Sequence, residues 1–124
     1  MPLRMLIDSG AVEAHDVALV GARNLDPPEE EFVRSSGLHV GDGAIDRAFE
    51  GVGCTYVALD CDVLEPTDMS VFMPEAGGLS RGEVERILRD VTGKAKVLGA
   101  GLSGLSFEPS NVEPLTSFGQ ALGL

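Results

Sequence analysis

Hydrophobic residues follow two different spacings along this chain, and the spacings alternate. Short β-rich runs at residues 17–21, 38–40, 54–62 and 95–98 predict strands. Between them, hydrophobic residues three and four positions apart predict helices. The predicted helices cover residues 2–10, the segment from 27 to Gly37, residues 44–52, a segment after Ser80, and a closing segment with Leu115, Phe118 and Leu122. This alternation is typical of an α/β fold with a parallel sheet flanked by helices.

Helix boundaries are marked by polar side chains that satisfy the first free backbone N–H groups. Asp26 with Pro27 predicts one helix start, and Asp42 is expected to cap another. Ser80 and Glu83 form a Ser-x-x-Glu capping box ahead of a regular hydrophobic stripe. These signals make the helix after Ser80 the best-defined element of the sequence.

The segment from Tyr56 to Pro66 carries the most distinctive chemistry. Its hydrophobic run predicts a strand covered on both faces, and Asp60 and Asp62 interrupt that run at the strand exit. Side chains alternate along a strand, so the two carboxylates are expected on one side, roughly 6.5 Å apart along the backbone, with Cys61 facing the other way. Their repulsion favours a divalent cation between them. The alternative is that one Asp caps the following turn while the other is solvated.

A glycine-rich segment, Gly99-Ala100-Gly101-Leu102-Ser103-Gly104, follows the last predicted strand. It has the Gly-x-Gly-x-x-Gly spacing of a dinucleotide-binding turn. No helix is predicted at the third glycine, and Pro109 follows soon after. An extended glycine-rich strand is therefore the preferred interpretation.

Composition narrows the class of protein. The chain has 124 residues, 44% of them hydrophobic, and a net charge of −11, which disfavours nucleic acid and anionic membranes as partners. No apolar run is long enough for a membrane span and no signal-peptide pattern is found, so a cytoplasmic location is expected. Cys54 and Cys61 are expected to be buried reduced thiols, and His15 and His39 structural or surface residues.

Two motifs resemble the ureohydrolases, the arginase and agmatinase family. The first is Val57-Ala58-Leu59-Asp60-Cys61-Asp62-Val63-Leu64-Glu65-Pro66, similar to the strand of that family that ends in Asp-x-Asp and precedes Leu-Asp-Pro. The second is Pro74-Glu75-Ala76-Gly77-Gly78-Leu79-Ser80, similar to its Pro-x-x-Gly-Gly-Leu-Thr. Leu19-Val20-Gly21-Ala22-Arg23 also resembles an earlier strand of the family, so the resemblance covers nearly the whole chain.

The resemblance implies a three-layer arginase-like α/β fold, with residues 1–124 as the C-terminal portion of the domain. It implies that Asp60 and Asp62 bind metal in a binuclear manganese centre that hydrolyses linear guanidino compounds, such as arginine or agmatine, and releases urea. Glu108 is the candidate for the family's substrate-binding Glu, although a gapless register places Gly104 there. No residue of this chain is expected to act as a catalytic acid or base.

The sequence also departs from the family pattern. The family's early His ligand and its Asp-x-His-x-Asp cluster have no counterpart, and Val71-Phe72-Met73-Pro74 stands in place of Thr-Gly-Thr-Pro. The strand that carries the missing cluster would lie between those matching residues 16–22 and 54–62. We therefore expect a fragment or one part of a split hydrolase, incomplete as a catalyst alone. Its expected partners are the missing N-terminal half or a second copy, besides the guanidino substrate.

Two other functions remain open from the sequence. The first is a catalytically silent α/β module that serves as a subunit or interaction domain, which the missing ligands favour. The second is a small flavodoxin-like binding domain, which the context of the glycine-rich segment disfavours.

Overall fold

The computed structural model describes residues 2–124, and the chain divides into two compact units, one up to Val52 and the other from Gly53. Strand pairing is parallel in both units, which confirms the α/β class. The pairs are β1 (Ala18–Leu19) with β2 (His39–Val40), and β3 (Cys54–Asp60) with β4 (Lys96–Ser103). Among the described residues no helix has the length and apolar character needed to cross a bilayer.

The first unit is built from short elements around one small sheet. Asp26 caps α2 through the Glu29 N–H (2.9 Å), and Gly37 ends that helix with φ +86°, as the sequence predicts. Asp42 does not cap α3, because the residue before that helix is Gly43 and no side chain bonds its free N–H groups. The elements are α1 (Pro2–Asp8), η1 (Ala14–Asp16), β1 (Ala18–Leu19), α2 (Pro27–Ser36), β2 (His39–Val40) and α3 (Ala44–Ala48).

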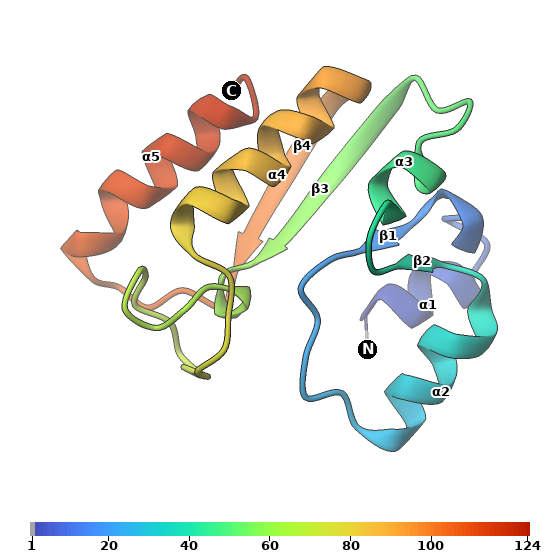
Figure 1. Ribbon diagram of the computed structural model, residues 1–124, viewed down its shortest axis with the longest axis horizontal. Helices are drawn as coiled ribbons and strands as arrows, with labels where there is room; N and C mark the ends of the chain where they lie inside the picture. The colour runs from blue at the N-terminus through green and yellow to red at the C-terminus, as the bar shows by residue number, and fades with distance from the viewer. Residues whose placement is uncertain (1) are drawn as a thin grey trace. The chain divides into compact units, whose positions relative to one another are not determined.

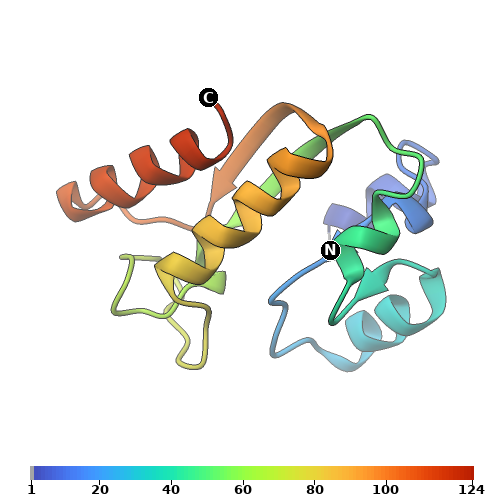
Figure 2. The same cartoon turned by 45° about the horizontal axis from the view of Figure 1, so that its top comes forward.

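The second unit holds the longer strands and helices. The β3–β4 pair runs in register from Cys54 opposite Lys96 to Asp60 opposite Ser103, with one irregularity after Thr55. Helices α4 and α5 lie side by side in this unit, as Figures 1 and 2 show. The elements are β3 (Cys54–Asp60), η2 (Cys61–Val63), α4 (Arg81–Lys94), β4 (Lys96–Ser103), η3 (Pro109–Asn111) and α5 (Val112–Ala121).

The core of the second unit lies between one face of the β3–β4 sheet and the two helices. Val84 and Leu88 of α4 and Phe118 of α5 are buried there. The Ser80–Glu83 capping box fixes the start of α4, with the Glu83 N–H donating to Ser80 Oγ at 3.2 Å. From the strands, the hydrophobic side chains packed against this core are Val57, Leu59, Val97, Ala100 and Leu102.

The opposite face of the same sheet is exposed, so the expectation of a strand covered on both faces is wrong for this chain. Burial alternates along β3, and Tyr56 is 64% exposed. Its ring lies over the glycines of β4: a Cβ at Gly101 would be 2.7 Å from the Tyr56 hydroxyl. Because β4 continues through these glycines to Ser103, the glycine-rich segment is an extended strand, as predicted.

The two cysteines differ in burial. Cys61 is fully buried in the core, whereas Cys54 is exposed, so the prediction of two buried thiols is correct for only one of them. Burial raises the pKa of the Cys61 thiol to about 11, and the negative charges of Asp60 and Asp62 add to the shift. Cys61 therefore stays protonated and inaccessible at neutral pH.

The loop between η2 and α4 is closed at its base by backbone contacts. The N–H groups of Gly77 and Gly78 both donate to the Glu65 carboxylate at 2.9 Å, and Leu79 N–H donates to Val63 O at 2.8 Å. A Cβ at Gly78 would be 2.5 Å from the Leu64 carbonyl carbon. Only a glycine allows the two backbones to approach so closely.

Gly78→Ala is therefore expected to destabilise the chain by about 1–3 kcal/mol, since the added methyl group forces the backbones apart. Gly82→Ala is the matched control, because no atom lies within 4 Å of its Cβ position in α4. The control should stabilise the chain by about 0.4–1 kcal/mol. Urea unfolding measures both changes, and an equally stable Gly78→Ala variant would contradict the close contact.

The difference in burial between Cys54 and Cys61 predicts how fast each thiol reacts with a modifying reagent. At about pH 8 a thiol reagent such as dithionitrobenzoate should modify one thiol of the native chain rapidly, and Cys54→Ala should abolish that rapid reaction. Cys61 should react only after unfolding in urea. Rapid labelling of two thiols in the folded chain would show that Cys61 is accessible.

Candidate functional site

The candidate site lies at the carboxyl end of the β3–β4 sheet. Because the strands are parallel, the segments that follow Asp60 and Ser103 leave the sheet at the same edge. In open α/β sheets ligands bind beyond this edge. The segments that meet there are residues 61–80, between β3 and α4, and residues 104–111, between β4 and α5.

Asp60 and Asp62 lie two residues apart at the end of β3, but they are not both on the strand. β3 ends at Asp60 and the chain turns into η2, so the prediction that both side chains project from one strand is wrong. The Asp62 N–H donates to Asp60 Oδ1 over a long 3.5 Å. Asp60 thus caps this turn, and the residue remains exposed. A turn-capping role for one of the two Asp residues was the alternative interpretation of the sequence.

Gly104 shapes the space beside the Asp60 carboxylate. A Cβ at this position would lie 2.3 Å from Asp60 Oδ1, and the backbone of Gly104 has φ +74°. Both the contact and the conformation require a glycine. The backbone of the segment after β4 therefore packs directly against the carboxylate of Asp60, the first candidate metal-binding residue.

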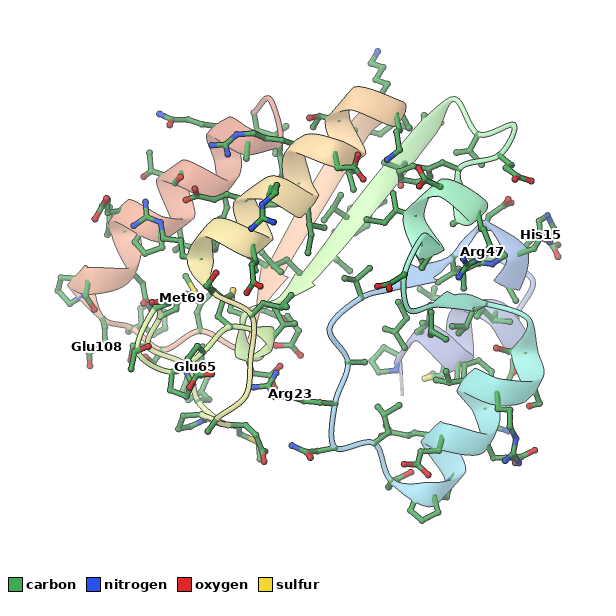
Figure 3. The ribbon with its side chains drawn as sticks, in the orientation of Figure 1. His15, Arg23, Arg47, Glu65, Met69 and Glu108 are labelled. Atoms are coloured by element: carbon green, nitrogen blue, oxygen red, sulfur yellow. The ribbon has the colours of Figure 1, made fainter. Side chains whose placement is uncertain are left out.

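Glu108 lies in the segment after β4, immediately before η3, and its side chain is exposed (Figure 3). Its N–H donates to Ser106 O at 2.9 Å. The two histidines lie in the first unit, where His39 Nε2 is 2.9 Å from His15 O. These contacts agree with the structural role predicted for the histidines.

The donor chemistry of this site fits part of a metal shell. Carboxylate oxygens are the ligands that hard divalent cations such as manganese prefer, and Asp60 and Asp62 carry them at the end of β3 and in the turn that follows. No group of three or more His, Cys, Asp or Glu side chains within residues 2–124 is arranged to hold a metal ion.

Sequence reasoning missed the polar residue that joins the two segments. Asn111 is 2% exposed, and its side-chain amide bonds the backbone of Ser70 and of Ser106. An Asn just before a helix resembles an ordinary capping residue, and no local pattern indicates that its partners lie 41 and 5 residues away.

Three solved structures with a similar fold belong to much longer chains. An arginase from Bacillus caldovelox superposes with a TM-score of 0.76 at 20% identity, covering 90% of this chain and 43% of that one. The proclavaminate amidino hydrolase of Streptomyces clavuligerus gives 0.78 at 23% identity, covering 98% and 46%. The formimidoylglutamase of Bacillus subtilis gives 0.80 at 13% identity, covering 100% and 46%. The chain thus spans less than half the length of each of these proteins.

Sequence comparison identifies the same group. A search of curated proteins found no significant match. The family model described as Arginase family, however, matches residues 1–107, which include both motifs and the whole β3–β4 sheet. Together with the shared fold, this match shows that the chain belongs to the arginase family.

Proposed function

We propose that this chain supplies part of a binuclear manganese centre in a hydrolase that releases urea from linear guanidino compounds of the arginine or agmatine type. The observation that carries the proposal is the position of Asp60 and Asp62, two residues apart at the carboxyl end of β3, in a chain of the arginase family. One of the similar structures is an arginase by name and another is an amidino hydrolase, which supports the class of substrate.

Each residue has a defined role in this proposal. Asp60 and Asp62 hold manganese through their carboxylates, and Gly104 leaves the Asp60 carboxylate the room to do so. When bound, a manganese pair supplies an activated hydroxide at neutral pH. The exposed Glu108 carboxylate contacts the guanidinium group by a charge-assisted hydrogen bond.

The proposal includes a partner, because two carboxylates do not fill the coordination shells of two metal ions. The remaining ligands would come from the rest of an arginase-like domain or from a second copy of this chain. The similar structures support the first source, since more than half of each lies outside the part that this chain matches. We also propose a cytoplasmic location, which two free thiols support.

A second candidate function is a catalytically silent subunit or interaction module. It is favoured by the absence of a three-ligand group within residues 2–124 and by the bond that Asp60 already accepts from the Asp62 N–H. The exposed Phe72 and Met73 side chains beside the site also suit an interaction surface.

Manganese binding separates the two functions. In a ¹⁵N-labelled sample of the chain, Mn²⁺ at about 1 mM should selectively broaden the amide signals of residues 60–63 and 104, since a two-carboxylate site binds weakly. Asp60→Asn and Asp62→Asn should each abolish this broadening. Asp90→Asn, which removes the same charge from the exposed face of α4, should not. Unchanged broadening in both site variants would favour the silent module.

The role of Glu108 predicts a specific loss of ligand binding. Titration with agmatine should shift the Glu108 amide signal, and Glu108→Gln should weaken this binding about threefold, because an exposed ion pair contributes little. Glu113→Gln is the control, since that carboxylate is also exposed but contacts Arg81. Equal affinity in the wild type and Glu108→Gln would remove Glu108 from the site.

A further inference from the structure

The side chain of Asn111 forms a buried hydrogen-bonded junction between two loops. Asn111 Oδ1 accepts from the Ser70 N–H at 2.9 Å. Asn111 Nδ2 donates to Ser70 O at 2.8 Å and to Ser106 O at 3.0 Å. The Ser70 and Ser106 hydroxyls are 2.6 Å apart and complete the junction. Among residues 2–124, Asn111 is also the one polar residue that is buried.

This junction ties the loop after β3 to the loop after β4. Beside it the loops run antiparallel, with a bridge between Val71 and Leu105. Ser106 N–H donates to Ser70 O at 3.2 Å, and Phe72 N–H donates to Gly104 O at 2.9 Å. All three side-chain bonds of Asn111 go to residues of these loops, and none goes to a strand or helix of the core.

Both ends of the junction lead to candidate site residues. Gly104, which accepts from Phe72, packs against the Asp60 carboxylate. At the other end, Asn111 N–H donates to Glu108 O at 3.0 Å. The positions of Asp60 and Glu108 are therefore connected through the two loops that Asn111 holds together.

An asparagine is the side chain that these contacts require, because its amide offers one acceptor and two donors at once. An Asp of the same shape lacks the donors when ionised, and it would face the carbonyl oxygens of Ser70 and Ser106. A buried carbonyl that loses its partner weakens the structure around it substantially.

We propose that Asn111 is a positioning residue, which locks the loops after β3 and β4 together and thereby fixes Glu108 and the backbone beside Asp60. The inference rests on the proposed function for the roles of Asp60 and Glu108. The locking itself is a property of the chain and is measured independently of metal or substrate.

The test is NMR-detected amide hydrogen exchange in the full 124-residue chain carrying Asn111→Asp. At about pH 8 the Phe72 and Ser106 amides should exchange about tenfold or more faster than in the wild type, since the buried carboxylate lacks donors. The α4 amides should keep their protection. Asn24→Asp is the matched control, because Asn24 is the other asparagine of the chain and is exposed.

The pH dependence of hydrogen exchange in Asn111→Asp distinguishes the loss of a hydrogen-bond donor from a general destabilisation of the fold. Burial keeps the engineered carboxyl protonated to higher pH than usual, and its protonated form can donate one bond. Protection of Phe72 and Ser106 should therefore partly return at about pH 5.5. The charged residues nearest in sequence to Asn111 and to its partner Ser70 are Glu108, Glu113 of α5 and Asp68. Arg81 of α4 bonds both Glu113 and Asp68. The wild type, in which residue 111 does not titrate, measures the contribution of these groups.

Two results would overturn the proposal: unchanged exchange at Phe72 and Ser106, or faster exchange spread equally over α4 and the β3–β4 sheet. If Asn111→Asp does not fold, Ser106→Ala decides, because it removes only the hydroxyl contact to Ser70. That variant should accelerate exchange about threefold at the same amides. No acceleration, or uniform acceleration, would contradict the locking role.

An agmatine titration links the junction to the site. The Glu108 amide shift seen in the wild type should be lost in Asn111→Asp at about pH 8 and partly recovered at about pH 5.5. A retained shift in the variant would overturn the positioning role. A wild type that shows no shift, but normal exchange behaviour at Phe72, would instead contradict the proposed role of Glu108.

Discussion

The parallel pairing of β3 with β4 is the constraint on which the second unit depends. It places Asp60 opposite Ser103, so that the two following loops leave the sheet at one edge and can contact each other. It also aligns the apolar side chains of one face against α4 and α5. A two-stranded sheet is marginal by itself, and this packing is what stabilises it. The candidate site is thus a consequence of strand register.

Close backbone contacts then set the geometry of the site. Gly78 approaches the Leu64 carbonyl group and Gly104 approaches the Asp60 carboxylate more closely than any other residue type allows. Glu65, which lies within the loop after β3 (Figure 3), and Asn111 hold these segments with hydrogen bonds to backbone groups. The loops that carry the candidate ligands are therefore fixed mainly by the fold, and their exposed side chains remain available for a ligand or partner.

Local chemistry explains which features could be predicted from the sequence. The capping box of Ser80 and the left-handed Gly37 depend on neighbouring residues, so their helix ends were predictable. The position of Asp62 in a turn was not predictable, because an Asp-x-Asp spacing fits both a continuing strand and the turn that Asp60 caps. The exposed face of the sheet, which carries Tyr56, was predicted to be buried. An apolar run in the sequence indicates a strand, but it does not indicate whether another element covers each face of that strand. The Asn111 junction depends on residues far apart in the chain.

We propose that this chain, a member of the arginase family, contributes the Asp60 and Asp62 carboxylates to a manganese site, and that further ligands come from the rest of an arginase-like domain or from a second copy. The most direct measurement is the anomalous X-ray scattering of manganese in crystals of the chain grown with Mn²⁺. We expect a manganese peak in contact with the Asp60 and Asp62 carboxylates, and this peak should disappear in crystals of Asp60→Asn. Manganese peaks confined to other exposed carboxylates, such as those of α2 or α4, would contradict it.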